Sequence, residues 1–417
     1  MKIGIQTWGS DGDILPFLAL AEGLQKAGHM VTLAYTSVDD KDYSDVATRA
    51  GIHALKVFER FGIDPDEAMA EIVRTNDPLK QVILVMQRFF DPALEAMYQA
   101  SRELCAHNDI VIGHMMNHTL LTAAQKQNIP RAVVVLAPLA IRTKYIPLFG
   151  PNLGTISNLL TWKLGDFVSK KKLFVKAEDL RVREGLPRLK STQEQLYVSH
   201  DLTLIACSSV LVVRRPDWGQ HIQICGDLRS QSVQQYMPVD EGMASFLKAG
   251  VPPVYITFGS LIPFENAKLD QLITKAVDVA GCRAIFQSGT DAKCSPNLFK
   301  CSKAPHATVF PQCAAIVHHG GAGTTHSALR AGKPSVVVEH AFDQLFWGKE
   351  LQKRGAGGEV LHRNTLTAEK LARAIAHTLA SAPMEKKAVE LGLAMRREDG
   401  VLNAVGLIEK KFAQRNA

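Results

Sequence analysis

The stretch IVHHGGAGTTHSALRAGKPSVVVEH, residues 316–340, carries the clearest structural signal of the chain. It opens as an apolar strand that ends at His319, passes through a glycine-rich turn, and continues from Thr324 as a helix that ends near Gly332. A second apolar strand, PSVVVEH, follows directly. A strand, a turn, a helix and another strand form a βαβ unit, so this stretch predicts two parallel strands joined by a crossover helix.

The same alternation of short apolar runs and helical patterns covers the rest of the chain. It begins with KIGIQTW at residues 2–8, and it restarts with PVYITFGSLIP at residues 253–263 after a polar stretch without periodicity. Such alternation is typical of doubly wound α/β folds, in which helices cover both faces of a mostly parallel sheet. We therefore expect two such domains in tandem, with ATVFP at residues 307–311 as one strand of the second.

The domain boundaries follow from where the pattern restarts. We expect an N-terminal domain over residues 1–228, a linker over 229–252, a C-terminal domain over 253–395, and a last helix over 396–417 that packs back toward the first domain. In open parallel sheets, ligands bind beyond the carboxyl ends of the strands, at the point where the strand order reverses. If the two domains face one another, these strand ends share a central cleft.

Composition and charge narrow the class of protein. The chain has 417 residues, of which 46% are hydrophobic and 21% charged, as in ordinary globular domains. Its longest apolar run, residues 132–141, is about half of what a membrane span needs, so we expect a cytoplasmic protein. A net charge of +7 suits phosphate-bearing ligands or an anionic membrane surface, and no segment is similar to a nucleic-acid-binding module. Seven scattered cysteines without CxxC spacing argue against a disulfide framework and a structural zinc site.

The glycine-rich turn after His319 is a candidate anion site. Backbone N–H groups at the start of a helix, together with the helix dipole, favour a negatively charged ligand. The spacing matches neither GxGxxG nor the P-loop, so the turn by itself is weak evidence. His318 and His319 are neighbours on a strand and point to opposite faces, which argues against a shared metal ion.

The turn after the first strand, SDGDILPF at residues 10–17, is different because it contains two acidic residues. Carboxylates beside a pyrophosphate cost Coulomb energy, so this turn does not read as a simple phosphate cradle. Asp13 can cap the helix that follows, or it can act as a general base. Asp11 is interpreted as a solvated turn residue.

Four motifs occur in order along the chain: GSDGDILP at residues 9–16, FGS at 258–260, FPQCAAIVHHGGAGTT at 310–325, and DQ at 343–344. Together they resemble the UDP-glycosyltransferases, family one of the GT-B glycosyltransferases. The similarity to sterol- and lipid-glucosylating and antibiotic-modifying bacterial members runs almost end to end. It implies two Rossmann-like domains facing a central cleft, and the transfer of a sugar from a nucleotide-sugar donor.

The resemblance also implies a set of donor-binding residues. In chain order these are Ser10, Gly12, Ser260, His319, Gly321, Gly323, Thr324, Thr325, Asp343 and Gln344. The histidine would contact the donor diphosphate, the glycines and threonines of the turn would surround the phosphates, and the Asp-Gln pair would bond the sugar hydroxyls. Such fixed donors stabilise the charge that grows on the leaving diphosphate. No metal and no cofactor is therefore expected besides the nucleotide sugar, for which UDP-glucose is the expected donor.

For catalysis, the resemblance implies that Asp13 takes the proton of the acceptor hydroxyl as it attacks the anomeric carbon. A free aspartate is a weak base and needs a partner, for which His114, at the end of the strand DIVIGH, is the candidate. Two departures from the family pattern leave the donor open. Thr308 stands where many relatives have a tryptophan against the nucleobase, and Glu339 and His340 replace the more usual residues before the Asp-Gln pair.

The acceptor is expected to be a hydrophobic molecule with a hydroxyl group, such as a lipid, a sterol or a natural product. The reasons are an apolar stretch at residues 115–124 and a basic amphipathic segment at 156–190, which also leaves peripheral membrane contact open. One alternative is a TDP-deoxysugar donor with an antibiotic or polyketide acceptor. Alternatives from another class are a nucleotide-sugar epimerase and a non-catalytic nucleotide-sugar-binding protein. The oligomeric state is left open.

Overall fold

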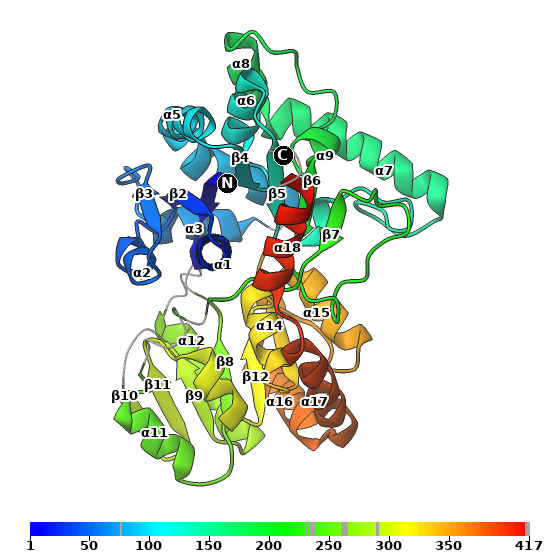
Figure 1. Cartoon of the computed structure of the whole chain (residues 1–417). Helices are drawn as coiled ribbons and strands as arrows, with labels where there is room; N and C mark the ends of the chain where they lie inside the picture. Colours follow the sequence, from blue (N-terminus) through cyan, green and yellow to red (C-terminus); the bar gives the residue numbers. More distant parts are fainter. Residues whose placement is uncertain (76, 231, 233–237, 260–265, 289–291, 413–417) are drawn as a thin grey trace. The chain divides into compact units, whose positions relative to one another are not determined.

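The computed structural model describes residues 1–75, 77–230, 232, 238–259, 266–288 and 292–412. Contacts within the chain divide it into two compact units, which Figure 1 shows in sequence colours. Unit 1 contains Met1–Ala68, Leu79–Gln231 and Asp399–Ala417, and unit 2 contains Met69–Pro78 and Ser232–Glu398. Each unit has its own sheet. The expected fold of two doubly wound α/β domains is confirmed.

The strands of unit 1 are all parallel and lie in the order β3-β2-β1-β4-β5-β6-β7. Their bounds are β1 Lys2–Gly9, β2 Met30–Ser37, β3 His53–Lys56, β4 Ile110–His114, β5 Arg131–Val135, β6 Leu202–Ile205 and β7 Ile222–Ile224. The chain builds outward from β1 to β3 and then returns to the other side of β1 with β4. The carboxyl ends of β1 and β4 therefore form the switch point of this sheet.

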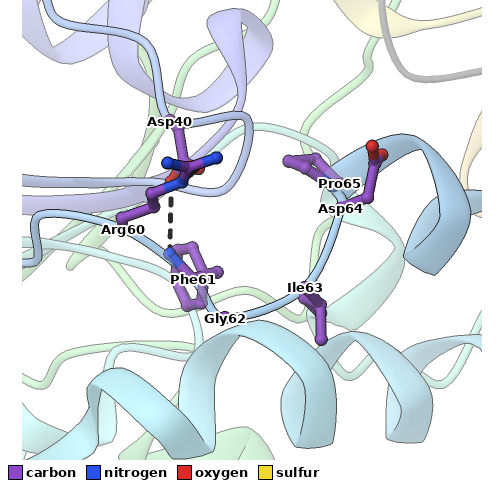
Figure 2. A pocket seen from close by; sticks show the side chains of 7 residues that line it. All are labelled: Asp40, Arg60, Phe61, Gly62, Ile63, Asp64 and Pro65. Carbon is purple, nitrogen blue, oxygen red and sulfur yellow. Dashed lines mark hydrogen bonds and ion pairs between the residues drawn. The ribbon is translucent and has the colours of Figure 1, made fainter.

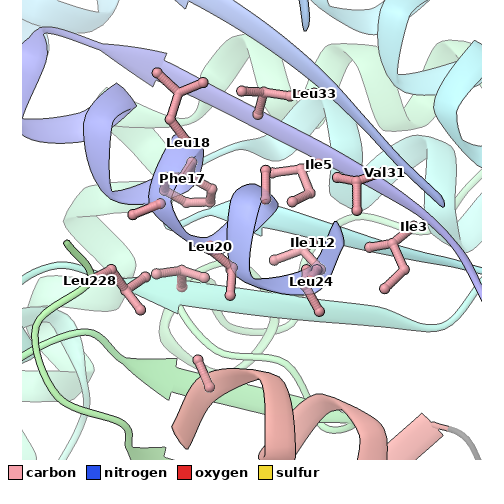
Figure 3. Close-up of a cluster of buried hydrophobic side chains, with 14 of the residues drawn as sticks. Ile3, Ile5, Phe17, Leu18, Leu20, Leu24, Val31, Leu33, Ile112 and Leu228 are labelled. Carbon is pink, nitrogen blue, oxygen red and sulfur yellow. The ribbon is translucent and has the colours of Figure 1, made fainter. Parts of the chain in front are cut away.

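Helices cover both faces of this sheet. Their bounds are α1 Asp11–Lys26, α2 Ser44–Arg49, α4 Pro78–Val85, α5 Asp91–His107, α6 His118–Gln127, α7 Thr155–Val168, α8 Val175–Arg183, α9 Thr192–Gln195 and α18 Gly400–Phe412, while α3 Pro65–Arg74 spans a boundary between the units. Ile112 packs into the core on the side of α1 (Figure 3), whereas its neighbour Val111 packs on the side of α5 and α6. Because neighbouring strand residues point to opposite faces, a strand covered on both sides is apolar throughout.

The sheet of unit 2 has the order β10-β11-β9-β8-β12-β13-β14, in which only the β10–β11 pair is antiparallel among the described strands. The bounds are β8 Val254–Thr257, β9 Ala284–Gln287, β10 Ala292–Ser295, β11 Leu298–Cys301, β12 Ala315–His318, β13 Ser335–Glu339 and β14 Leu361–His362. Here the order reverses between β8 and β12. Their carboxyl ends form the second switch point.

Helices also cover both faces of the sheet of unit 2. The bounds are α11 Glu241–Lys248, α12 Asn266–Ala280, α13 His306–Val309, α14 Ala322–Arg330, α15 Gln344–Lys353, α16 Ala368–Ala380 and α17 Ala382–Arg396. Ile256 packs with the buried side chains of α12 and α16, and Tyr255 packs with those of α11 and α13. Across the described part of the chain, no helix combines the length and the apolar character needed to cross a membrane.

The expected strand ATVFP is wrong. Residues 306–309 form the short helix α13, and a single 3-10 turn, Phe310–Gln312, follows. Pro311 has no backbone N–H and cannot donate to a sheet ladder. The two helical turns bury Val309 and Phe310 in the core of unit 2, so tertiary packing overrides the local β-propensity.

The last helix, α18, belongs to the core of unit 1. Its buried residues Ala404, Val405, Ile408 and Phe412 are part of the same hydrophobic cluster as α1. The side chain of Asn403 also donates a hydrogen bond to the carbonyl of Cys225 at 3.0 Å.

Truncating Ile408 tests this packing. Ile408 is completely buried, so Ile408→Ala leaves a cavity under α1, and we expect it to lower the free energy of unfolding by about 2–5 kcal/mol. Leu402→Ala on the same helix removes an exposed side chain and serves as the matched control. The measurement is urea denaturation of both variants; equal losses would contradict the assignment of α18 to the core.

Candidate active site

Asp13 lies in the first turn of α1, directly after β1, and its carboxylate folds back over the strand end. One carboxylate oxygen, Oδ2, accepts hydrogen bonds from the backbone N–H of Ser10 at 3.0 Å and from its hydroxyl at 3.4 Å. Gly9 has φ +130°, and a Cβ atom on it would collide with this carboxylate. Asp13 thus meets the helix-capping role through Oδ2, which leaves Oδ1 for another contact.

His114 provides that contact. It is the last residue of β4, which lies beside β1 at the switch point, and its Nε2 is 3.4 Å from Oδ1 of Asp13. The histidine side chain is 5% exposed, whereas that of Asp13 is 34% exposed. The structure therefore brings the two expected catalytic residues together, and an external hydroxyl would meet the carboxylate before the imidazole.

Aromatic rings hold the His114 side chain in place. Trp8 packs edge-on against it with ring centroids 6.0 Å apart, and Phe17 lies at 5.9 Å. Beyond Trp8, the ring of Phe90 contacts that of His118 at 4.4 Å. The sequence gives no signal for this packing, because its members come from β1, α1, the turn before α5 and α6.

Asp11 is not a solvated turn residue, so that interpretation is wrong. It accepts hydrogen bonds from the Lys41 ammonium at 2.8 Å and from the Tyr43 hydroxyl at 2.5 Å. Burial, and then the charge of Asp11, raise the pKa of Tyr43 above its ordinary value. Asp11 thus ties the start of α1 to the chain that follows β2. Gly12, beside it, is exposed, and a Cβ atom there would meet open space.

In unit 2, His319 follows β12 at the switch point with β8. A Cβ atom on Gly259 would lie 3.0 Å from the His319 ring, and one on Gly321 would collide with it. The two glycines therefore permit the close approach of backbone to imidazole. Burial lowers the pKa of His319 to about 4, so the ring is neutral near pH 7. Ser260, the other candidate at this strand end, falls outside the described residues.

The turn from Gly320 opens helix α14, whose N-cap is Gly321. Gly320 has φ +88°, and a Cβ atom on it would lie 2.7 Å from the carbonyl oxygen of Gln344. The first amide to bond within the helix is that of Thr325, which donates to Gly321 at 2.9 Å. The preceding amides have no intrahelical acceptor, and Gly323 is exposed with open space beside it. This end of α14 can therefore receive an anion.

The two threonines of this turn differ. Thr324 is half-buried, whereas Thr325 is fully buried and its amide is used by the helix. The hydroxyl of Thr325 has no hydrogen-bond partner among the described residues. A phosphate contact of Thr325 would therefore involve only this hydroxyl.

Known proteins that are similar to this chain include glycosyltransferases. Residues 283–399 match the family model for the erythromycin biosynthesis protein CIII-like C-terminal domain. A sterol 3-beta-glucosyltransferase of Arabidopsis thaliana is 27% identical over 97% of this chain and 67% of its own length. An uncharacterized glycosyltransferase of Mycobacterium leprae is 26% identical over 100% of this chain and 98% of its own. Together, these similarities support a family 1 glycosyltransferase of the GT-B fold.

Solved structures agree with this glycosyltransferase fold. The glycosyltransferase of kitacinnamycin superposes with a TM-score of 0.72 over 99% of both chains at 17% identity. The Streptomyces glycosyltransferase SsfS6, complexed with thymidine diphosphate, has a TM-score of 0.59 over 98% of this chain and 99% of its own at 18% identity. This chain spans 67%, 64% and 27% of the first three sterol glucosyltransferases it matches.

In unit 2, Asp343 and Gln344 lie at the start of helix α15 after β13, and hydrogen bonds fix both side chains. Asp343 Oδ2 accepts from the Trp347 indole N–H at 2.6 Å. Gln344 Oε1 accepts from the backbone N–H groups of His340 at 2.7 Å and Ala341 at 3.1 Å. These bonds use the amide oxygen of Gln344, so its NH₂ group is the part that can donate to a ligand.

Of the three residues that depart from the family pattern, Glu339 and His340 have contacts within unit 2. Glu339 pairs with His362 on the neighbouring strand β14. His340 is buried with its ring 5.3 Å from that of Phe258, and burial lowers its pKa to about 3. Thr308, the third departure, lies in α13.

Strained backbone marks the loops at the strand ends. Among the described non-glycine residues, those with positive φ are Asp40, Met116, Asn128 and Phe342. Asn128 caps helix α6, but the other three follow β2, β4 and β13 at their carboxyl ends. Such strain persists only where the surrounding structure enforces it, and it clusters at functional sites.

A cavity of about 400 Å³ lies between the loop after β2 and the segment after β3 (Figure 2). Its lining consists of Asp40 and residues 60–65. The carboxylate of Asp40 accepts a hydrogen bond from the N–H of Phe61 at 3.4 Å and lies 3.9 Å from the Arg60 guanidinium. The sequence offers no motif for it, because loop residues that shape a pocket carry no periodic pattern.

Replacing His118 tests whether its buried imidazole stays neutral in the folded protein. Burial lowers the pKa of His118 to about 3, so it stays neutral in the folded state while the unfolded chain takes up a proton below pH 6.5. Because only the unfolded chain takes up this proton, the His118 imidazole lowers the free energy of unfolding as the pH falls from 7 toward 3. In His118→Phe, we expect the loss of unfolding free energy between pH 7 and pH 5 to be smaller by about 2 kcal/mol.

Urea denaturation at the two pH values measures this difference. The exposed His107 offers a matched control, because His107→Gln removes a histidine without changing the core. An unchanged pH dependence in His118→Phe would contradict a neutral, buried imidazole.

Proposed function

We propose that the protein transfers a hexose from a UDP-sugar to a hydroxyl group of a hydrophobic small molecule, with inversion and without a metal. The observation that carries this proposal is the Asp13–His114 pair at the switch point of unit 1. One oxygen of the carboxylate is fixed by Ser10, and the other lies 3.4 Å from a buried imidazole. Such a carboxylate is positioned to accept a proton from an external hydroxyl.

In the proposed reaction, the acceptor hydroxyl loses its proton to Asp13 while its oxygen forms a bond to the anomeric carbon. The bond between that carbon and the diphosphate oxygen breaks, and its electron pair leaves with the diphosphate. His114, whose Nε2 lies 3.4 Å from Oδ1, orients the carboxylate, and the transferred proton stays on Asp13. A single displacement of this kind inverts the configuration at the anomeric carbon.

Unit 2 would stabilise the leaving diphosphate. The first-turn amides of α14 offer hydrogen-bond donors at the positive end of a helix dipole. His319 is neutral near pH 7, so it would contribute a hydrogen bond rather than a charge. The Asp343 carboxylate and the Gln344 amide suit sugar hydroxyls, which both donate and accept.

Similar proteins support the proposed acceptor and the proposed nucleobase of the donor. Sterol glucosyltransferases of plants and fungi align with nearly the whole chain, which supports a hydrophobic acceptor with a hydroxyl group. The fold neighbour complexed with thymidine diphosphate favours the second candidate, a TDP-sugar donor. Thr308 in place of a tryptophan is compatible with either base.

Gly323→Ala tests the diphosphate site. An added Cβ meets no protein atom, and alanine is the better helix former, so the variant should be as stable as the wild type or up to about 1 kcal/mol more stable. The methyl group would occupy the space beside the first-turn amides, so we expect the affinity for the donor nucleotide to fall at least tenfold. Calorimetric titration with UDP, TDP and GDP, together with thermal unfolding, measures both effects.

Gly406→Ala on α18 is the matched control, because it also adds a methyl group in open space on a helix. His319→Ala should weaken the binding of the same nucleotide. If Gly323→Ala bound the nucleotide as tightly as the wild type, the end of α14 would not be the phosphate site.

Asp13→Asn separates base chemistry from capping. Asparagine can still accept the hydrogen bond from the backbone N–H of Ser10, the N-cap of α1, so the capping box is kept and stability should change by less than about 1 kcal/mol. It is not a base, so transfer should fall by about 10²–10⁴ while the nucleotide affinity stays constant. The assay is mass spectrometry of products formed from UDP-glucose and TDP-glucose with a panel of sterols, hydroxylated lipids and polyketides.

If Asp13→Asn kept full activity, Asp13 would not be the base, and its role would be limited to capping α1. Conversion of the donor sugar without an acceptor would instead indicate an epimerase. Nucleotide binding with no product from any acceptor would indicate a binding protein.

A further inference from the structure

Helix α7 of unit 1 presents an apolar face to solvent. The residues of this face are Leu153, Ile156, Leu160, Leu164 and Phe167, which we call the α7 apolar face, and their side chains are between 53% and 79% exposed. Ile156, Leu160, Leu164 and Phe167 recur every three or four residues, so they lie on one side of the helix, while Leu153 lies just before it. A surface helix normally turns such a stripe toward the core, so an exposed stripe of this size indicates an interaction surface.

The opposite side of α7 is firmly attached to unit 1. The Trp162 indole donates to the carbonyl of Ile146 at 2.9 Å, and the Asn158 amide donates to that of Lys144 at 3.0 Å. Both residues are buried. The orientation of the helix is therefore fixed, and the apolar face is not simply the result of a helix that has rotated out of its packing.

The segment of the chain that contains α7 is rich in basic residues. Between residues 139 and 177 the sequence has one acidic residue, Asp166, and seven basic ones: Arg142, Lys144, Lys163, Lys170, Lys171, Lys172 and Lys176. Asp166 accepts hydrogen bonds from the N–H and hydroxyl of Thr192, both at 2.6 Å, and also pairs with Lys170 at 3.7 Å. Arg142 pairs with Glu194 at 3.0 Å. Lys163, Lys171 and Lys172 are exposed. Helical spacing places Lys163 on the same side as the apolar residues, and Lys171 and Lys172 lie in the π-helical turn Ser169–Leu173 that follows α7.

We propose that the α7 apolar face docks the protein on an anionic phospholipid surface. A helix that exposes apolar residues together with lysines lies in the plane of the membrane interface, with its apolar side in the acyl boundary and its lysines at the lipid phosphates. At 14 residues, α7 is about 21 Å long, too short to span a bilayer but sufficient to lie on one.

The charge distribution favours this occupant over a second copy of the chain. Two copies that met through their α7 apolar faces would bring two strongly basic surfaces together, and like charges across an interface oppose association. A bilayer with anionic headgroups supplies both the apolar interior and the opposite charge. The proposal does not depend on the proposed function, since it concerns binding without any donor or acceptor.

The test is sedimentation of the full chain with vesicles of phosphatidylcholine containing 30% phosphatidylglycerol, and with vesicles of phosphatidylcholine alone. We expect binding to the anionic vesicles that weakens with added salt, and little binding to the neutral ones. Lys171→Gln/Lys172→Gln should lower the partition coefficient roughly 25-fold, at about fivefold per lysine. Ile156→Ser/Leu160→Ser/Phe167→Ser should lower it at least tenfold.

Each variant has a matched control. Lys410→Gln/Lys411→Gln removes two exposed lysines from the end of α18, and Val279→Ser/Leu393→Ser/Leu402→Ser removes three exposed apolar side chains elsewhere. Both controls should bind anionic vesicles like the wild type, and all variants should keep the wild-type melting temperature because the changed residues are exposed.

Equal losses in a variant and its control would overturn the proposal, because binding would then follow charge or hydrophobicity in general. It would also be overturned if the wild type did not bind anionic vesicles. Sedimentation velocity completes the test: a dimer that dissociates only in the α7 triple variant, together with absent vesicle binding, would assign the face to self-association.

Discussion

The structure depends on a constraint of parallel sheets that are covered on both faces. Where the crossover helices that follow two neighbouring strands pack on opposite faces of the sheet, the two connections run in opposite directions. The carboxyl ends of these two strands then stay uncovered. In unit 1 this happens between β1 and β4, and in unit 2 between β8 and β12. Asp13, His114 and His319 all lie at these two places. The topology therefore brings the candidate catalytic and binding residues to these two places, although they are far apart in the sequence.

Glycine then sets the fine geometry at each switch point. In unit 1, Gly9 lets the carboxylate of Asp13 fold back onto the strand end. In unit 2, Gly259 and Gly321 flank the ring of His319, and Gly320 lets α14 and α15 begin close together. At all four positions, a Cβ atom would come close to Asp13, to His319 or to the backbone carbonyl of Gln344. Gly323 differs because no protein atom opposes it, and that open space is what a bound phosphate requires.

Burial and hydrogen bonding give the site groups different tasks. His118, His319 and His340 are kept neutral because burial disfavours their charged forms. Asp13 keeps one third of its side chain accessible, so it can meet an external hydroxyl. The same contrast separates α18, whose apolar residues complete the core of unit 1, from α7, whose apolar residues face solvent between exposed lysines.

By itself, the sequence determined the two α/β sheets and the positions of the glycine-rich turns. Apolar periodicity and glycine have local physical causes that need no tertiary information. The strand expected at ATVFP failed because proline and core packing decide against local propensity there. Only the tertiary structure decided that Asp11 is an anchor, that His114 reaches Asp13, and that the stripe of α7 is exposed. Contacts between residues distant in sequence follow from strand order and helix packing, and no single segment encodes them.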